Sequence, residues 1–433
     1  MSRHAVVAGG SLGGLLAARV LADHFERVTV IERDRLPSGG AHRRGVPQGP
    51  HTHCLIASGR DAIEELLPGF TAAVVAQGGT VADMQGECRW YTEGHRMRQA
   101  PIGMHVLLAG RALLESHVRE RVRGIGNVFF HENAEVAGLT VDGERVTGVR
   151  LLDPAQGTVE ADLVVDATGR GARGTAWLRD AGFTAPEEDR VDVGIVYTTR
   201  RFRRLPEHMG HDRALVITTT ADNRRGGAMI AQEGDRWIVS LFGYLGETPP
   251  PDLDGFTDFA GTLAAKDIHD VVRNAEPVGE ALVIRFPASR RRRYERLGRF
   301  PEGYLVLGDA LCSFNPIYAQ GMAVTAIEAR LLGESLRAAG PSRLAEDFFA
   351  RVTPVVDAAW DTAVGGDLKH PGIEGERSPG LERTHAFLSQ VYLAASRDAE
   401  VARSFVRVVN LTDGPDSLAD PAFAGRVQAA AAG

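Results

Sequence analysis

Short apolar runs alternate with helical stretches in the first third of the chain, which is the pattern of parallel strands joined by helices. An apolar run at 5–8 is followed by glycines, by a helical stretch at 15–21 and by a second buried strand at 28–31. Another buried run at 163–165 has the same character. These segments predict an α/β domain built on a parallel sheet.

An alternating pattern of apolar and polar residues dominates the middle of the chain and predicts a mostly antiparallel sheet. The predicted strands there are 191–199, 214–219, 228–232, 237–244 and 280–286, with a helix at 256–272. Further pattern-based elements are short antiparallel strands within 79–101, a helix at 107–123, a meander at 126–152, a strand at 304–307, a helix at 320–336, and helices from 343 onward.

These patterns predict a chain that leaves the parallel sheet and returns to it. A discontinuous three-layer α/β domain is expected from 1–78, 104–185 and 287–340. A β-rich domain, made of 79–103 and 186–286, is expected to form a wall of the substrate site. Residues 341–433 are expected to form a helical C-terminal part.

The first strand is followed by a glycine-rich turn, Gly9-Gly10-Ser11-Leu12-Gly13-Gly14. Gly9, Ser11 and Gly14 take the three positions of the dinucleotide fingerprint, in which the glycines make the tight turn and let the helix pack closely on the strand. Ser11 departs from the strict pattern, which a residue with negative φ tolerates, and its hydroxyl could donate to a phosphate. Glu32 ends the second strand, where a carboxylate accepts from a ribose hydroxyl. This context favours a Rossmann-like ADP-ribose site over a tight turn in another α/β fold.

Composition narrows the possible partners. The 433 residues are 24% charged and 44% apolar, with a net charge of −7, which argues against nonspecific binding to nucleic acid or an anionic membrane. Three scattered cysteines predict neither disulfides nor a metal site. With no leader and no apolar run of about eighteen residues, we expect a cytoplasmic protein without stable membrane insertion.

A second glycine motif lies late in the chain. The strand at 304–307 is followed by Gly308-Asp309-Ala310, and then by Pro316 and Gln320-Gly321-Met322. Asp309 is placed to bond a ribityl hydroxyl, and a glycine at a helix start can direct backbone N–H groups at a phosphate or at a flavin. By itself, Asp309 could equally be a helix cap. Together with the first motif, the cofactor interpretation is favoured.

With both motifs, the chain resembles the single-component (group A) FAD-dependent monooxygenases. Within that class it is most similar to the bacterial olefin epoxidases of polyether antibiotic biosynthesis. The stretches that carry this similarity are 45–53, 287–295, 314–322, and Trp360 with Asp367 and Pro371.

The resemblance implies which residues contact FAD. Glu32 would bind the adenosine ribose, Arg111 the phosphate or ribityl region, Asp309 the ribityl chain and pyrophosphate, and Arg43 or Arg44 the flavin side. Gly321 and Met322 would lie against the isoalloxazine. The full set that it implies is Gly9, Gly10, Ser11, Gly13, Gly14, Glu32, Arg33, Arg43, Arg44, Arg111, Val136, Asp166, Thr168, Gly169, Asp309, Pro316, Gly321 and Met322.

The resemblance also implies a reaction. NAD(P)H would reduce FAD, O₂ would give a C4a-hydroperoxide, and one oxygen atom would pass to an olefin of an apolar polyketide or terpenoid in secondary metabolism. The cofactor carries this chemistry, so no catalytic side chain is assigned. Phe314 and Tyr318 are candidates for the substrate pocket, and a monomer or a homodimer is expected.

Alternatives stay open. Hydroxylation of an aromatic polyketide is one, although Thr168-Gly169 replaces the Asp-Gly pair usual in aromatic hydroxylases, and no base is apparent. An FAD-dependent isoprenoid reductase or dehydrogenase is another, and a flavoprotein without enzymatic activity is a third. Ala319-Gln320-Gly321 replaces the usual Gly-Gln-Gly, which could narrow the backbone over the flavin.

Three other features have simpler interpretations. His51 and His53 are expected to make hydrogen bonds in a loop rather than to bind a metal. The run at 290–293 is expected to be a solvated basic stretch, with a contact to the 2′-phosphate of NADPH as the alternative. Trp360 is expected in the core at a contact between domains.

Overall fold

A five-stranded parallel sheet organises the half of the molecule that contains the N-terminus. The computed structural model describes residues 3–171 and 173–432. In their order across the sheet, the strands are β18 (Tyr304–Val306), β12 (Leu163–Asp166), β1 (His4–Ala8), β2 (Arg27–Glu32) and β8 (Val128–Glu132). All four pairings are parallel. Because β12 pairs with both β1 and β18, segments far apart in the sequence build one sheet.

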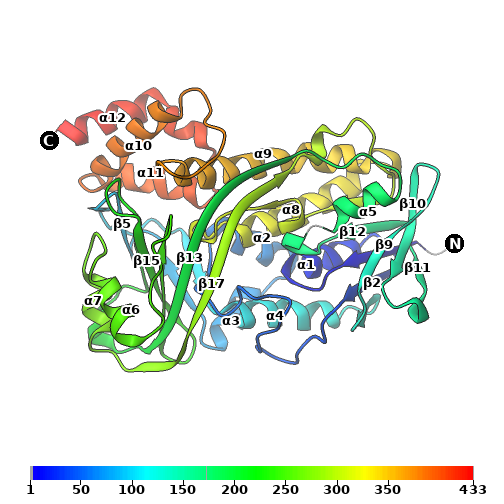
Figure 1. Cartoon of the computed structure of the whole chain (residues 1–433), viewed down its shortest axis with the longest axis horizontal. Helices are drawn as coiled ribbons and strands as arrows, with labels where there is room; N and C mark the ends of the chain where they lie inside the picture. Colours follow the sequence, from blue (N-terminus) through cyan, green and yellow to red (C-terminus); the bar gives the residue numbers. More distant parts are fainter. Residues whose placement is uncertain (1–2, 172, 433) are drawn as a thin grey trace.

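Helices and a second sheet cover this parallel sheet, as its apolar strands require. Helix α1 (Leu12–Leu21) packs against α4 (Arg111–Arg123) and α8 (Gly321–Ala338). An antiparallel sheet of β9 (Val136–Asp142), β10 (Arg145–Leu151) and β11 (Thr158–Glu160) packs on β12 through β10 (Figure 1). The result is the predicted three-layer arrangement.

An eight-stranded mixed sheet forms most of the other half. Its strands in spatial order are β19 (Cys312–Ser313), β17 (Pro277–Arg292), β13 (Glu188–Arg203), β16 (Arg236–Gly243), β15 (Arg225–Gln232), β14 (Ala214–Ile217), β5 (Cys88–Thr92) and β6 (His95–Arg96). Strands β13 and β17 have 16 residues each and run together along the molecule (Figure 1). Helices α6 (Leu253–Ala260) and α7 (Asp267–Val272) pack against this sheet.

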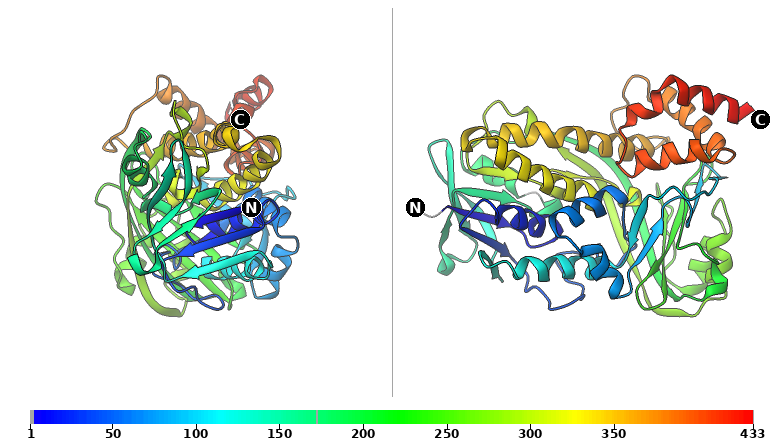
Figure 2. Two further views of the ribbon diagram at one scale, coloured as in Figure 1. Left: turned by 90° about the vertical axis from the view of Figure 1, so that its right-hand side faces the viewer. Right: turned by 180° about the vertical axis from the view of Figure 1, so that it is seen from behind.

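The C-terminal part is helical. It comprises α9 (Leu344–Asp367), α10 (Leu381–Ala395), α11 (Ala399–Val409) and α12 (Pro421–Ala432). Helix α9 packs along α8, whereas α10, α11 and α12 form a separate group at the end of the molecule farthest from the N-terminus (Figure 2). Trp90 of β5 meets Phe405 of α11 edge to face at 6.0 Å, which joins this group to the large sheet. In the described part of the chain, no helix has the length and apolarity needed to span a membrane.

Short elements complete the chain. They are β3 (Cys54–Leu55), α2 (Ala57–Leu66), α3 (Phe70–Ala76), β4 (Thr80–Asp83), β7 (His105–Leu108) and α5 (Gly174–Asp180).

The predicted fold class is confirmed, with three corrections to its elements. Residues 107–108 end strand β7, and the helix begins only at Arg111, after Ala109-Gly110. Residues 128–132 pair with β2 as the edge of the parallel sheet rather than joining a meander, because an apolar run does not reveal its partner strand. The helix expected at 256–272 is two helices. The residue boundaries between domains stay a prediction.

Candidate cofactor and substrate cavity

A cavity of about 2130 Å³ extends from the glycine turn to the C-terminal helices. Pockets for single drug-sized ligands usually measure about 300–1,000 Å³, so this one has room for a cofactor and a substrate together. The carboxyl ends of β1, β2 and β12 open into it, and the eight-stranded sheet and α9 to α11 supply the rest of its wall. Ligands of α/β sheets bind at such carboxyl ends.

The glycine turn has the geometry that the fingerprint requires. Gly9 has φ +110°, and a Cβ added to Gly14 would lie 1.8 Å from the Gly9 carbonyl oxygen. Ser11 has φ −89°, so this position does not need glycine. Among the described residues, no side chain caps the N-terminus of α1. Its first amide groups are therefore available to bind an anion.

Glu32 faces this turn from the end of β2. One carboxylate oxygen accepts from the Gly10 amide at 2.8 Å, and the other accepts from the Asp34 amide at 3.0 Å. These two bonds fix the side chain where it lines the cavity. A ribose beside the turn would find an oriented acceptor there.

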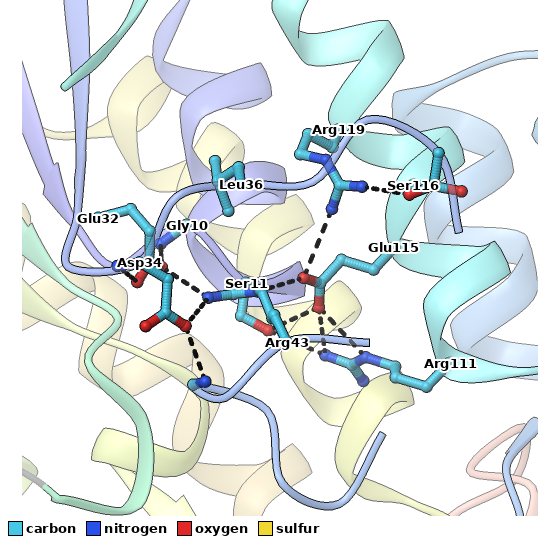
Figure 3. Close-up of polar contacts among 12 residues, drawn as sticks. Gly10, Ser11, Glu32, Asp34, Leu36, Arg43, Arg111, Glu115, Ser116 and Arg119 are labelled. Atoms are coloured by element: carbon cyan, nitrogen blue, oxygen red, sulfur yellow. Dashed lines mark hydrogen bonds and ion pairs between the residues drawn. The ribbon is translucent and has the colours of Figure 1, made fainter. Parts of the chain in front are cut away.

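Two arginines reach the turn from different elements (Figure 3). Arg111 is the first residue of α4, and its Nη2 donates to the Ser11 hydroxyl at 3.2 Å. Arg43 comes from the loop after β2 and lies 3.1 Å from Glu32 and 3.2 Å from Asp34. Both arginines also contact Glu115 of α4. Arg43 thus belongs to the glycine-turn end of the cavity.

Asp309 follows strand β18, which lies on the other side of the central strand β1 from β2 and Glu32. Asp309 also lines the cavity. Its carboxylate lies 3.9 Å from Nε of Arg170. Burial raises the pKa of Asp309, and Arg170 and Arg111 counter this effect. The preceding Gly308 donates its amide to the buried Glu328 at 2.6 Å, which anchors the turn to α8.

Most of the predicted cofactor residues line the cavity. Those that line it are Gly9, Ser11, Gly13, Glu32, Arg33, Arg43, Arg111, Val136, Thr168, Gly169, Asp309, Pro316, Gly321 and Met322. Gly10, Gly14, Arg44 and Asp166 do not line it. Gly10 and Gly14 shape the turn, Arg44 is exposed, and the buried Asp166 accepts from Thr168 and Tyr304.

The donors and acceptors of the cavity beside the glycine turn suit FAD. The uncapped helix start and the Arg111 guanidinium match a diphosphate, and the fixed Glu32 carboxylate matches a ribose hydroxyl. One expectation changes: the Ser11 hydroxyl donates to Glu115 at 2.8 Å, so its proton does not point to the cavity.

The remaining wall is mostly apolar. Phe314 and Tyr318, the two predicted substrate-pocket residues, both line the cavity, and Trp360 lies in the core and contributes to the same wall. Other apolar side chains there are Met84, Trp90, Ile230, Phe242, Phe387, Leu388, Phe405 and Val408. An apolar ligand of considerable size fits such a surface.

A buried carboxyl group, Asp367 at the end of α9, stands behind this apolar wall. Its Oδ1 accepts from the Tyr244 hydroxyl at 2.8 Å, the Asn315 amide at 2.9 Å and the Tyr318 hydroxyl at 3.1 Å. Its Oδ2 is buried and has no partner among the described residues. Burial raises the pKa of Asp367 to about 7 despite these hydrogen bonds and the charge of Lys369.

The role of Asp367 was not predicted, although the resemblance includes this residue. Nothing in the local sequence distinguishes it from an ordinary helix-end aspartate. Only the fold brings Tyr244 and Asn315, from two distant segments, onto its carboxylate. We name Asp367, Tyr244, Asn315 and Tyr318 the Asp367 cluster.

The two histidines make hydrogen bonds, as expected. His51 Nδ1 contacts the Thr199 hydroxyl at 2.7 Å, and His53 Nδ1 contacts the His51 carbonyl at 2.9 Å. Burial lowers their pKa values to about 4 and about 3. Both rings are therefore neutral at pH 7.

The interpretation of 290–293 as a solvated basic run is wrong. Arg291 and Arg292 are 1% and 4% exposed because this run ends strand β17 inside the protein. Arg292 pairs with Glu188 at 2.9 Å, and Arg291 pairs with Asp357 and Glu295. A run of like charges does not reveal the acidic partners that distant segments supply.

The profile of a protein family described as an FAD binding domain matches residues 3–359. The chain belongs to this family. The chain is also 34% identical over 429 residues to protein Rv3254 of Mycobacterium tuberculosis, covering 95% of this chain and 90% of that protein. FAD is thus supported as its cofactor, as the sequence predicts.

Solved structures share this FAD-binding fold. PqsL, a probable FAD-dependent monooxygenase from Pseudomonas aeruginosa, is 18% identical and has a TM-score of 0.66, with 86% of this chain and 97% of that chain covered. The tetrameric form of 2-methyl-3-hydroxypyridine-5-carboxylic acid oxygenase is also 18% identical, with a TM-score of 0.62 and 93% and 98% covered. The flavin-dependent brominase Bmp2 is 14% identical, with a TM-score of 0.69 and 99% and 98% covered.

Proposed function

We propose that this protein is an FAD-dependent monooxygenase that uses NAD(P)H and O₂ to epoxidise an olefin of an apolar polyketide or terpenoid in secondary metabolism. The observation that carries the proposal is the single cavity with two unlike ends. Gly9, Gly13, Glu32 and Arg111 line it near the glycine turn, whereas aromatic and aliphatic side chains such as Phe387 and Phe405 line it near the C-terminal helices. PqsL and the pyridine carboxylate oxygenase share the fold and suggest the reaction class.

The chain's own residues would bind and shield rather than react. FAD, reduced by a nicotinamide nucleotide, supplies activated oxygen when it is bound. The predicted cofactor residues would hold its diphosphate and ribose at the glycine turn. Phe314, Phe242 and Trp360 would keep water out of the cavity beside the cofactor and hold an apolar chain there. Oxygen transfer to a carbon–carbon double bond removes no substrate proton, so no base is required.

Hydroxylation of an aromatic polyketide is the second candidate, and the Asp367 cluster favours it. Tyr318 lines the cavity, and its hydroxyl donates to Asp367 behind it at 3.1 Å. A phenolic substrate could pass its proton to the Tyr318 oxygen while Tyr318 passes its own proton to the carboxylate. A pKa of about 7 suits Asp367 to accept a proton at neutral pH.

The isotopic composition of the product distinguishes these reactions. The holoprotein is supplied with NADPH and ¹⁸O₂, together with a panel of polyenes and a panel of polycyclic phenols, and products are analysed by mass spectrometry. The proposal expects polyene products with one ¹⁸O atom as an epoxide, formed equally by the Asp367→Asn variant. Labelled phenol products that disappear in this variant would establish the second candidate. Saturated or newly desaturated products without ¹⁸O would replace both with a reductase or dehydrogenase.

A further inference from the structure

Glu115 occupies the centre of a buried charged cluster behind the glycine turn (Figure 3). One carboxylate oxygen accepts from Nε of Arg43 at 3.1 Å. The other accepts from the Ser11 hydroxyl at 2.8 Å and lies 3.4 Å from two nitrogens of Arg111. Arg119 lies 3.8 Å away on the same helix. We name these five residues the Glu115 cluster.

Three members of the Glu115 cluster line the cavity and two do not. Ser11, Arg43 and Arg111 line the cavity, whereas Glu115 and Arg119 do not. The Glu115 side chain is only 5% exposed. Glu115 therefore stands behind the three groups that face the cavity and touches each of them. It can set their orientation without contacting a ligand itself.

Arg111 depends on Glu115 more than Arg43 does. Arg43 also pairs with Glu32 and Asp34, at 3.1 and 3.2 Å. For Arg111, Glu115 is the only carboxylate within ion-pair distance in the part of the chain that the structure describes. Arg111 and Glu115 are four residues apart on α4, so the helix itself holds them together.

The arginines around Glu115 favour its ionised form. Burial alone would raise its pKa, but Arg111, Arg43 and the Ser11 hydroxyl together hold the pKa below its ordinary value. A permanent carboxylate thus lies between cations that would otherwise repel one another. One donor also remains: Nη2 of Arg43 is buried and has no partner among the described residues.

We propose that Glu115 is the positioning residue of the FAD diphosphate site and acts through Arg111. It turns the Arg111 guanidinium toward the uncapped start of α1, and it accepts a hydrogen bond from the Ser11 hydroxyl, whose oxygen is then free to accept from Arg111. Arg111 and the α1 amides would then bind the diphosphate together. The proposal rests on the FAD-binding family and not on the reaction proposed above.

The test is the binding of ADP to the flavin-free protein, measured by calorimetry. ADP carries the diphosphate without the flavin, and adenosine serves as the ligand without phosphate. In Glu115→Gln we expect the Kd for ADP to rise about tenfold or more, as for the loss of an oriented charged hydrogen bond, with the Kd for adenosine unchanged. FAD should lose affinity by the same factor as ADP.

Glu295→Gln is the matched control. Glu295 also contacts two arginines, Arg291 at 3.3 Å and Arg293 at 3.4 Å, but none of the Glu115 cluster. The control changes the net charge equally and should leave the Kd for ADP unchanged. If Glu115→Gln lowers the melting temperature yet binds ADP like wild type, Glu115 is only structural and the proposal fails. Tighter ADP binding would also overturn it, because Glu115 would then repel the diphosphate.

A second pair of variants keeps the test valid if Glu115→Gln does not fold. The single variant Arg111→Gln removes one partner of the Arg111–Glu115 ion pair. The double variant Arg111→Gln/Glu115→Gln removes both, so neither residue leaves an unpaired charge on the other. If Glu115 acts through Arg111, both variants bind ADP equally weakly. If the Kd values for ADP of the single and double variants differ by more than about threefold, Glu115 does not act through Arg111. ADP binding needs neither reductant nor O₂, so failed oxygenation would leave this result intact.

Discussion

The Glu115 cluster and the Asp367 cluster are two buried carboxylate sites with opposite surroundings. Glu115 meets three arginines and a serine, and its pKa lies below the ordinary value. Asp367 meets two phenols and one amide, and its pKa rises to about 7. Both carboxylates are buried, but their neighbours differ. One therefore stays charged, and the other exchanges a proton near neutral pH.

This difference matches what each end of the cavity would bind. A diphosphate is always charged at neutral pH, so donors held by a permanent ion-pair cluster suit it. The substrate end has apolar walls, and a carboxyl group that can become neutral costs less to bury there. Four variants test this comparison, in order of decreasing expected effect.

Gly14→Ala should disrupt the charged end most strongly. The new Cβ would lie 1.8 Å from the Gly9 carbonyl, so the turn after β1 must open. We expect a loss on the order of 5 kcal/mol in unfolding free energy, measured by urea denaturation, and loss of bound FAD. Gly298→Ala is the control, since nothing lies within 4 Å of its added Cβ. Retention of flavin by Gly14→Ala would contradict this description of the turn.

Glu115→Gln should destabilise the protein by about 4 kcal/mol at pH 7, because three buried arginines lose a counter-ion. The pKa of Glu115 is lowered on folding, so its contribution is present above the unfolded pKa and fades as pH falls through the folded pKa. The deficit should therefore shrink on acidification. Urea denaturation at several pH values measures the difference in unfolding free energy between wild type and variant. A difference that grows toward acid pH would contradict a lowered pKa of Glu115.

Asp367→Asn should show the reverse pH dependence. The unfolded chain releases this proton near pH 4 and the folded protein keeps it to about pH 7, so the carboxyl group reduces stability as pH rises between these values. The variant cannot ionise and should gain about 3 kcal/mol relative to wild type between pH 5 and pH 8. The same denaturation series measures this gain. A difference that does not change with pH would mean that Asp367 is already ionised at pH 5.

Ala319→Gly should have the smallest effect, a stabilisation of about 1 kcal/mol. Ala319 has φ +55° in the turn before α8, a conformation that glycine adopts without strain. Ala41→Gly should not stabilise the protein, because Ala41 is exposed and does not itself have a positive φ. Thermal denaturation compares them. Destabilisation by Ala319→Gly would show that the Ala319 methyl group packs usefully.

The sequence was most informative where local geometry restricts the residue type. The Gly9 turn, the presence of a helix after it and the placement of Glu32 follow from steric and hydrogen-bonding requirements within one βαβ unit. It was least informative about partners from distant segments. Strand β8 was assigned to the wrong sheet, and the buried ion pairs of Arg291 and Arg292 were missed.

The candidate site shows the same limit. The late motif identified Asp309 and Gly321 because glycine and aspartate at a strand end are recognisable locally. Glu115 was not predicted, although its spacing of four from Arg111 is the one signal that could have identified it. The proton-exchanging character of Asp367 depends on Tyr244 and Asn315, which no sequence pattern connects to it.

Flavin reoxidation is the measurement that shows whether this cavity holds FAD in a monooxygenase. The holoprotein is reduced with NADPH without air and mixed with O₂ in a stopped-flow spectrometer, with and without a polyene. We expect oxidised flavin to return in at least two phases and the polyene to lower the yield of hydrogen peroxide, because activated oxygen is kept until it is transferred. A single phase, with the same peroxide yield in both cases, would contradict this expectation.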